Sequence, residues 1–409
     1  MQHTATASDP ATDHPAPTGA EVDFPPEHLL ASATDARGVI HYANQEFCDI
    51  ARMSKEYING APHKVVRHPD MPRGLFHLMW DRLHAKLPVC TYVKNSTADG
   101  GFYWVFATVT PTRDGYLSVR IKPRSEFFEL TRDIYAAMVT EEARGLPPDK
   151  SAEWMLARLA EHGYPDFDAF TYAALDAEFG IREDIDTGSE SDFGKIVRLT
   201  ELMDKSDTLV QEIIGIFQKV RGEPINLRIL SGRLEGAGVA IGTISKNYET
   251  MSADMYQMIE RLRCDETGLL VRMRNALGRA KSATQIATLM DLTARQSAAK
   301  YDAAERNLGG REILHAQSEA LSEISRIAVS EVANMGKLVP DVCRQLRRRI
   351  NGLDLVKLLC RVESGRMSDV DSGLVGIIRR LEEAHHQTDR HLATLSATAF
   401  QIDSTSKSL

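Results

Sequence analysis

One short stretch of the sequence places residues able to bind a polar ligand on a stiff backbone. It runs Pro62-His63-Lys64-Val65-Val66-Arg67-His68-Pro69-Asp70-Met71-Pro72. Proline fixes its own φ near about −65° and disfavours a helical conformation in the residue before it, so two prolines restrict the backbone around Asp70. Arg67, His68 and Asp70 would then be presented from a rigid loop ahead of a helix. Such a loop could hold a planar polar ligand, or it could be a structural turn whose side chains satisfy one another.

Two other patterns imitate binding sites. The run from Gly236 to Gly242 resembles a dinucleotide fingerprint, but it lies in helical sequence with no preceding strand. Four side chains share helical spacing and could bind a metal, yet we expect a solvated helix face there: Glu382, His385, His386 and Asp389. Since no nucleophile–base pair, P-loop, kinase or cyclase signature is present, the sequence does not predict an enzyme.

Composition is that of an ordinary globular protein. Of 409 residues, 43% are hydrophobic and 26% are charged, and 49 Lys and Arg against 57 Asp and Glu give a net charge of −8. A net acidic chain has no overall electrostatic reason to bind nucleic acid. Five scattered cysteines without a CxxC pair predict neither a disulfide framework nor a zinc site.

The sequence also carries signals about location. No stretch approaches the roughly 18 apolar residues that span a bilayer. The first twenty residues lack the basic and apolar regions of a secretion signal. We therefore expect a cytoplasmic protein without stable membrane insertion.

Prolines divide the chain into two kinds of sequence. Fourteen of the sixteen lie at or before Pro165, and the remainder is rich in good helix formers. We expect four segments: a disordered tail at 1–25, an α+β domain at 26–125, a helical connector at 126–190 and an all-α output or dimerisation module at 191–409. The last would be a long-helix hairpin or bundle.

The α+β domain should contain an antiparallel sheet with flanking helices. Asp-Gly steps after the third and fourth strands predict tight hairpins. The expected strands are Leu29–Ser32, Gly38–Tyr42, Val89–Asn95, Phe102–Pro111 and Tyr116–Pro123, and the expected helices are Asn44–Ala51, Lys55–Ile58 and Arg73–Lys86.

The connector and the last module read as helices throughout. The connector helices are expected at Phe127–Glu142, Ser151–His162 and Phe167–Glu178, and breaks between the later long helices near Gly222–Pro224, Gly309–Gly310, Pro340 and Asn351–Gly352. A heptad-like seam suited to pairing with another helix precedes the first break. It consists of Ile196, Leu199, Met203, Val210, Ile213, Phe217 and Val220, with polar Ser206 interrupting.

Several separated motifs in the first domain resemble one family. They are Gly38-Val-Ile-His-Tyr-Ala-Asn44-Gln-Glu-Phe47, Ile58-Asn-Gly60, Val66-Arg-His-Pro-Asp-Met-Pro72, Phe76-x-x-Met79-Trp80, Val93-Lys94-Asn95 and Tyr103-Trp104-Val105. In this order they are similar to the PAS domains of bacterial aerotaxis receptors, over roughly residues 28–123. The resemblance implies an FAD-binding PAS domain that reports redox state or oxygen to the chemotaxis machinery.

Carried over residue by residue, the resemblance implies six flavin contacts: Asn44, Arg67, His68, Asp70, Trp80 and Asn95. Some relatives hold haem instead, for which the candidate axial ligands are His41, His63, His68, His77 and His84. Where the family often has Pro-Trp after the helix, this chain has Pro88-Val89-Cys90, which makes the distance of Cys90 from the pocket worth testing.

A second, weaker resemblance lies in the helical module. Asn226, Leu230 and Glu235 fall at the spacing of the hairpin tip of chemotaxis receptors, while the Gly-Arg-Gly-Phe turn of that tip is missing. We therefore expect self-association, or binding of a chemotaxis-type or other cytoplasmic signalling protein, with little direct control of a chemotaxis kinase.

Two hypotheses follow from the sequence. The first is a cytoplasmic sensor whose PAS domain responds to redox state or oxygen through FAD and passes the signal to a helical output module, acting as a dimer. The second is a cofactor-free PAS scaffold that uses its PAS domain and helices for dimerisation. A purified sensor should be yellow, or red if it binds haem, and a scaffold should be colourless.

Overall fold

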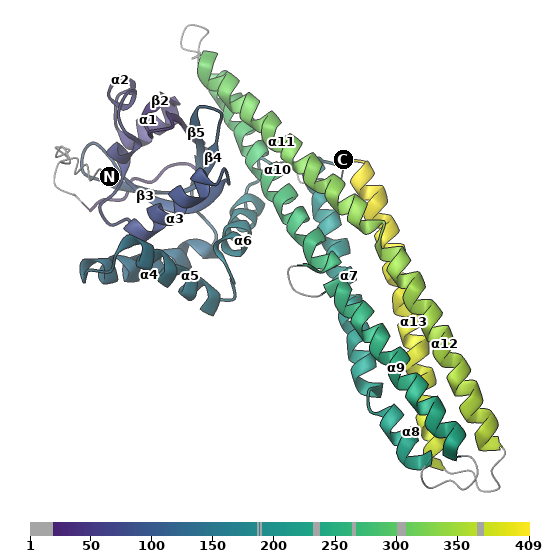
Figure 1. The fold of residues 1–409 in the computed structure, drawn as a ribbon. Helices are drawn as coiled ribbons and strands as arrows, with labels where there is room; N and C mark the ends of the chain where they lie inside the picture. The colour runs from purple at the N-terminus through teal and green to yellow at the C-terminus, as the bar shows by residue number, and fades with distance from the viewer. Residues whose placement is uncertain are drawn as a thin grey trace, which may run out of the picture. The chain divides into compact units, whose positions relative to one another are not determined.

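The computed structural model describes residues 19–185, 188, 190–231, 238–263, 267–300, 308–365 and 372–409 (Figure 1). The chain divides into two compact units. Unit 1 comprises Met1–Asp186 and Ser282–Glu323, and unit 2 comprises Thr187–Lys281 and Ile324–Leu409. The segment 282–323, expected in the helical module, thus groups with the first domain.

Unit 1 is built on a five-stranded antiparallel sheet. The strands are β1 (Leu30–Asp35), β2 (Ile40–Ala43), β3 (Val89–Ser96), β4 (Phe102–Pro111) and β5 (Gly115–Ile121), in the spatial order β2-β1-β5-β4-β3. Every strand pair is antiparallel. The predicted fold class is confirmed, and each predicted strand is present.

The turn between β4 and β5 was predicted correctly, but Gly115 is needed there for another reason than the one expected. The Asp-Gly pair was expected to supply positive φ, which Gly100 does with a φ of +85°. Gly115 has no such φ; a Cβ there would instead collide with the backbone of Thr34 and Asp35 on β1. The glycine is needed because two strands approach closely at that point.

Short helices cover one face of the sheet. They are α1 (Gln45–Ala51), α2 (Lys55–Ile58), the 3-10 turn η1 (His63–Val66) and the longer α3 (Arg73–His84). Asn44 and Ser54 cap α1 and α2 by accepting from backbone N–H groups. Residues 19–25, assigned above to a disordered tail, are partly ordered: Val22 N donates to Phe102 O (2.7 Å), and Phe24 is buried in the core.

The connector forms three helices close to the predicted ones: α4 (Glu126–Ala143), α5 (Pro148–Glu161) and α6 (Phe167–Gly180). Aromatic packing joins α4 to the sheet. The ring centroid of Phe128 lies 5.6 Å from that of Tyr92 on β3 and 5.3 Å from that of Trp104 on β4. Helix α6 packs against β3.

Unit 2 is helical, and α10 and α11 run through both units. The remaining helices are α7 (Asp192–Val220), α8 (Glu223–Ser231), α9 (Gly238–Arg263), α10 (Leu269–Lys300), α11 (Leu308–Gly336), α12 (Val339–Gly365) and α13 (Ser372–Lys407). Every residue of the predicted seam on α7 is buried, and α13 packs against this helix. Among the described helices, none combines the length and apolar composition of a membrane span.

The predicted helix breaks were partly right. Breaks occur at Gly222 and immediately before Pro340, whereas Gly309 and Gly310 lie in the first turn of α11. The break at Asn351–Gly352 was wrong, because α12 continues through it. A Cβ at Gly352 would meet the end of the flexible Met251 side chain, so this glycine lies where α12 packs against α9. Packing outweighs the roughly 1 kcal/mol cost of a helical glycine.

Only part of the region that resembles a receptor tip is described by the structure. Residues 232–237, Glu235 among them, and the side chain of Leu230 lie outside the described residues. The amide of Asn226 donates to the Glu223 carboxylate (3.1 Å), which also accepts from Arg380 of α13 (2.6 Å). Gly238–Gly242, the imitation of a dinucleotide loop, lies within helix α9.

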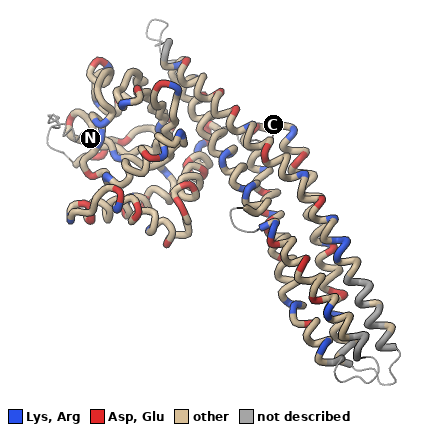
Figure 2. The backbone as a smooth tube through the Cα atoms, viewed as in Figure 1, with Lys and Arg blue, Asp and Glu red and all other residues tan. Residues whose placement is uncertain are grey.

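Charged residues of both signs alternate along these helices (Figure 2). Helix α12 carries a basic cluster, Arg344 and Arg347–Arg349. Within it, Arg347 pairs with Asp389 of α13 (2.6 Å) and Arg349 with Asp254 of α9 (2.7 Å). His385, expected on a solvated face, is buried, and its Nε2 lies 3.0 Å from the Tyr248 hydroxyl. That expectation was wrong because helical spacing does not reveal which face another helix covers.

Candidate functional site

A cavity of about 150 Å³ lies between the sheet and the segment η1–α3. Strands β1, β3, β4 and β5 form its floor, and α3 forms the opposite wall through Phe76, Met79, Trp80 and Leu83. Of the lining residues, only Lys64 is exposed. The cavity is therefore enclosed by the domain and opens near η1.

Strand alternation decides which polar groups enter the cavity. Successive side chains of a strand point to opposite faces, and the register places Ser118 beside Ser32 and Val109, and Arg120 beside Ala107. All five line the cavity. Ser118 and Arg120 of β5 thus face the cavity, while Val119 between them faces the opposite side of the sheet.

Arg120 carries a positive charge into this interior. It is 3% exposed, its Nη2 lies 2.6 Å from His63 Nε2, and its guanidinium carbon lies 5.1 Å from the centroid of the Phe47 ring. Burial lowers the pKa of Arg120 to about 10, so it stays charged at neutral pH. No carboxylate of the described residues forms an ion pair with it. An unpaired buried cation is costly unless something else compensates it.

His63 is held neutral beside this cation. Burial, and then the charge of Arg120, lower the pKa of His63 to about 3. Its Nε2 accepts from Arg120 and also lies 3.3 Å from Ser32 Oγ. Because His63 is neutral, Arg120 supplies the positive charge at this point of the cavity, which favours a negative or electron-rich ligand.

Polar atoms in the cavity lack partners. Arg120 Nη1, Ser118 Oγ and Asn95 Nδ2 are buried without a hydrogen bond of good geometry among the described residues, although the Asn95 side chain lies close enough to the Tyr103 hydroxyl to oppose the rise of its pKa on burial. Native proteins rarely leave such groups unsatisfied, and one explanation for an exception is a ligand. Three atoms of one small cavity are unsatisfied together, so the chemistry of this donor set fits the polar edge of a heteroaromatic ring.

Aromatic side chains supply flat walls. Trp80 stacks on His84 with ring centroids 5.8 Å apart and meets Tyr116 edge-on at 5.3 Å. The Arg67 guanidinium carbon lies 3.6 Å from the centroid of the Phe76 ring. The cavity thus combines aromatic walls with polar groups on its floor, as sites for planar ligands do.

Three of the six residues implied by the resemblance lie together in this cavity: Arg67, Trp80 and Asn95. A bridge between Arg67 and Asn95 attaches the proline-rich loop to edge strand β3. The stiff loop is therefore an extension of the sheet edge, which explains how Arg67 reaches the mouth.

Asn44 lies outside the cavity lining, and both polar atoms of its side chain make hydrogen bonds to the backbone. Its Oδ1 accepts from Ala31 N (2.8 Å) and Phe47 N (3.2 Å), and its Nδ2 donates to Leu29 O (2.7 Å). These bonds join β1 to α1. Asn44 therefore shapes the domain from outside the cavity.

His68 and Asp70 also lie outside the cavity lining. His68 is buried, its Nδ1 accepts from Asp70 N (3.1 Å), and its ring packs edge-on against Phe102. The Asp70 carboxylate is exposed and pairs with Lys94 (2.7 Å). Both residues make contacts within the loop or to β3, which is the arrangement expected of a structural turn.

Of the candidate haem ligands, only His63 lines the cavity. His41, His77 and His84 are exposed. Since Arg120 engages Nε2 of His63, the described donor set fits a flavin-type ring better than haem iron. Cys90 alternates to the opposite face of β3, where it is buried, and does not line the cavity.

Sequence reasoning missed Arg120 and Ser118. The run Leu117-Ser118-Val119-Arg120-Ile121 contains the available signal: a charged side chain two residues from a serine inside an apolar strand. Alternation would have placed both on one face.

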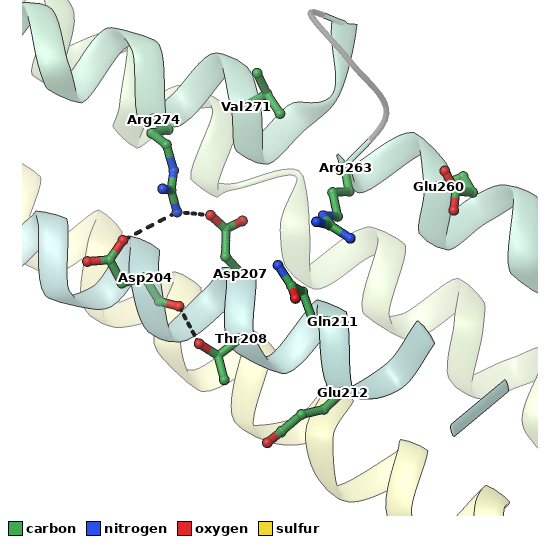
Figure 3. A pocket seen from close by; sticks show the side chains of 9 residues that line it. All are labelled: Asp204, Asp207, Thr208, Gln211, Glu212, Glu260, Arg263, Val271 and Arg274. Atoms are coloured by element: carbon green, nitrogen blue, oxygen red, sulfur yellow. Dashed lines mark hydrogen bonds and ion pairs between the residues drawn. The ribbon is translucent and has the colours of Figure 1, made fainter. Parts of the chain in front are cut away.

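A second, larger cavity of about 1070 Å³ lies in unit 2 among α7, α9 and α10 (Figure 3). Three of its six charged residues pair with one another: Arg274 donates to Asp204 (3.3 Å) and pairs with Asp207. None of its described lining atoms is buried without a partner. It resembles an open groove between helices more than a ligand site.

Comparison with known proteins agrees with this architecture. A family model described as a PAS fold matches residues 40–119. The chain is 33% identical over 132 residues to the aerotaxis receptor of Escherichia coli (strain K12). The N-terminal domain is an aerotaxis-receptor-type PAS domain. The aligned region covers 31% of this chain and 26% of that receptor.

Regulatory proteins show a more distant similarity to the PAS domain. The nitrogen fixation regulatory proteins of Klebsiella pneumoniae and Klebsiella oxytoca are each 28% identical over 117 residues, which is 28% of this chain and 22% of theirs. The chain thus matches about a quarter of the length of these relatives. By their names, these similar proteins are a receptor and two regulatory proteins.

Proposed function

We propose that this protein is a sensor whose PAS domain binds FAD, with the isoalloxazine ring in the 150 Å³ cavity, and reports redox state through its helices. The observation that carries the proposal is the group of buried, unpartnered polar atoms on Arg120, Ser118 and Asn95. A ring edge with carbonyl oxygens and ring nitrogens would satisfy them.

The cavity residues divide into three roles. Arg120, Ser118 and Asn95 would bind the polar edge of the ring, and Trp80 with Phe76 would pack on its faces. At about 150 Å³ the cavity is smaller than typical ligand pockets of roughly 300–1,000 Å³, so it would have to widen to take the ring and would leave the rest of the dinucleotide outside. Arg67 and exposed Lys64 stand at the opening, where an anionic diphosphate would find positive charge.

Bound flavin supplies reversible electron transfer with a change of charge at its ring. The protein's part is to respond to that change. The Arg120 guanidinium favours negative charge in the cavity. Neutral His63 accepts a hydrogen bond from Arg120 and adds no second positive charge. A different charge in the cavity therefore changes the interactions of β5 and η1, which biases the domain between two arrangements.

Output would pass to the long helices. The buried seam on α7 packs against α13, so self-association would use other helix surfaces or an exchange of helices. We propose a dimer, or a complex with a chemotaxis-type or other signalling protein, as the receiving partner.

The test is the visible absorption spectrum of the purified full chain, before and after incubation with FAD and then under anaerobic reduction. The proposal requires a flavin spectrum that bleaches reversibly. Arg67→Ala should weaken flavin retention, whereas Lys122→Ala, a charge change outside the cavity, should not. A chain that stays colourless with excess FAD would favour the cofactor-free scaffold, and a haem spectrum would favour haem.

A further inference from the structure

The N-terminus of α3 is capped by a side chain from another helix. Its N-cap position, Pro72, offers no side-chain hydrogen bond. Instead Glu142 of α4 accepts from Arg73 N with Oε2 and from Gly74 N with Oε1, both at 2.8 Å. A carboxylate at this position satisfies free backbone donors and complements the helix dipole.

The same carboxylate joins α5 to this point. Ser151 Oγ donates to Glu142 Oε1 (2.6 Å), and a Cβ on Gly74 would collide with Ser151 and with the backbone of Ala152. Burial alone would raise the pKa of Glu142, but the hydrogen bonds from Ser151, Arg73 and Gly74 outweigh it and lower the pKa. An ionised glutamate therefore ties three helices together.

Helix α3 also forms the wall of the cavity. Phe76, Met79 and Trp80 lie within the two turns that follow the capped end. The charge of Glu142 acts on Arg67 at the cavity mouth as well, opposing the effect of burial on the pKa of Arg67. A ligand that moves α3 must therefore move or strain the bonds to Glu142.

A second buried glutamate repeats this arrangement one helix further on. Glu178 of α6 accepts from Arg124 N (2.9 Å) and from Ser125 N (3.0 Å), at the start of α4. Ser125 itself makes no side-chain cap for α4. Carboxylates thus link α6 to α4 and α4 to α3, and α3 ends this series at the cavity.

We propose that Glu142 is a positioning residue that couples the ligand cavity to the connector helices α4 and α5. Its carboxylate holds the cavity wall α3 at a fixed place relative to α5. By linkage, a ligand that changes α3 changes α5, and loosening α5 changes the affinity for the ligand by the same factor. The proposal takes its ligand from the proposed function, but the coupling itself is a property of the helices.

The test is hydrogen exchange of the full chain with and without FAD, read from peptides covering α3 and α5. In the unaltered chain, FAD should slow exchange in both. In Glu142→Gln, one backbone N–H would face an amide NH₂, so exchange at the start of α3 should rise about tenfold. FAD should still protect the cavity side of α3, but the response of α5 should be lost.

The matched control is Glu129→Gln, which removes an exposed carboxylate of the same helix that pairs only with Arg132. It should respond to FAD like the unaltered chain. Ser151→Ala removes a single bond from the same carboxylate and should weaken the α5 response even if Glu142→Gln folds poorly. A full α5 response in Glu142→Gln or Ser151→Ala, or its loss in Glu129→Gln, would overturn the proposal.

Met79→Ala separates this inference from flavin binding. This substitution disturbs the cavity wall without any ligand. On its own, Met79→Ala should raise hydrogen exchange in α5. In a chain that already carries Glu142→Gln, adding Met79→Ala should not change α5 exchange further. If FAD fails to bind, the proposed function fails while this comparison still decides the coupling. Equal responses to Met79→Ala in both backgrounds would contradict it.

Discussion

The two faces of the sheet treat buried polar groups in opposite ways. On the connector face, Glu178 accepts hydrogen bonds from the Tyr92 hydroxyl, from Ser125 Oγ and from two backbone N–H groups. On the cavity face, Arg120 has no carboxylate partner within the described part of the chain, and there one of its nitrogens and Ser118 Oγ are unsatisfied. Both sets are buried within the same domain.

The difference separates structural groups from groups available to a ligand. A buried group with all its partners stabilises the fold, and its loss leaves those partners unsatisfied. A buried group without partners costs stability in the free protein, and that cost is recovered when a ligand supplies the partner. The cavity face therefore has the energetics of a binding site, and the connector face has those of a joint between structural elements.

The largest effect is expected on the connector face. Glu178→Ala removes the acceptor of the Ser125 N–H at the start of α4 and leaves the Tyr92 and Ser125 hydroxyls only each other as partners. We expect the free energy of unfolding to fall by about 3–5 kcal/mol, measured by urea denaturation. Glu183→Ala, which changes a nearby carboxylate that makes none of these hydrogen bonds, is the control. A loss below about 1 kcal/mol would remove the contrast between the faces.

The second prediction concerns pH on the cavity face. The pKa of His63 is lowered from 6.5 to about 3, so below pH 6.5 the unfolded chain binds this proton and the folded chain does not. The free energy of unfolding should therefore fall as the pH drops from 6.5 toward 3, by up to about 1.4 kcal/mol per unit. His63→Gln should show a shallower dependence between about pH 5 and 6.5. Exposed His84→Gln should keep the original slope, and equal slopes for all three proteins would contradict the assignment.

Two asparagines allow the cavity to be compared with the rest of the domain using the same side chain. Asn44 has all its side-chain bonds to backbone, so Asn44→Ala should lower the free energy of unfolding by about 1–2 kcal/mol. Asn95 has an unpaired amide nitrogen in the cavity, so Asn95→Ala should change stability by less than about 0.5 kcal/mol while weakening flavin binding. Thermal denaturation and flavin titration of the two variants test this, and the reverse pattern would show that Asn44 is the ligand contact.

Local sequence signals were sufficient for much of the fold. Strand-like runs and Asp-Gly turns gave the order of the PAS elements, and the spacing on α7 gave its buried seam. The signals failed where tertiary packing decides, as at Gly352, which lies beside the Met251 side chain and does not end α12. The order of Phe24 likewise depends on a core that a local reading does not contain.

The site was predicted less completely for the same physical reason. Of the six residues implied by the resemblance, Arg67, Trp80 and Asn95 line the cavity, and their contact with a flavin stays a prediction. The resemblance could not separate them from Asn44, His68 and Asp70, because all six lie close to the same sheet and only side-chain direction divides them. Arg120 escaped notice because its importance lies in a missing partner, which no sequence pattern displays.

The central claim is that Arg120 is unpaired because a ligand completes its interactions. Arg120→Met removes a buried charge and keeps an apolar side chain of similar length. The most direct test measures, on one preparation, the free energy of unfolding of the flavin-free chain and its affinity for FAD. The account predicts that stability rises, by about 1–4 kcal/mol, while FAD binding is lost. Unchanged FAD affinity, or a large loss of stability in the flavin-free chain, would show that Arg120 serves the fold and contradict the account.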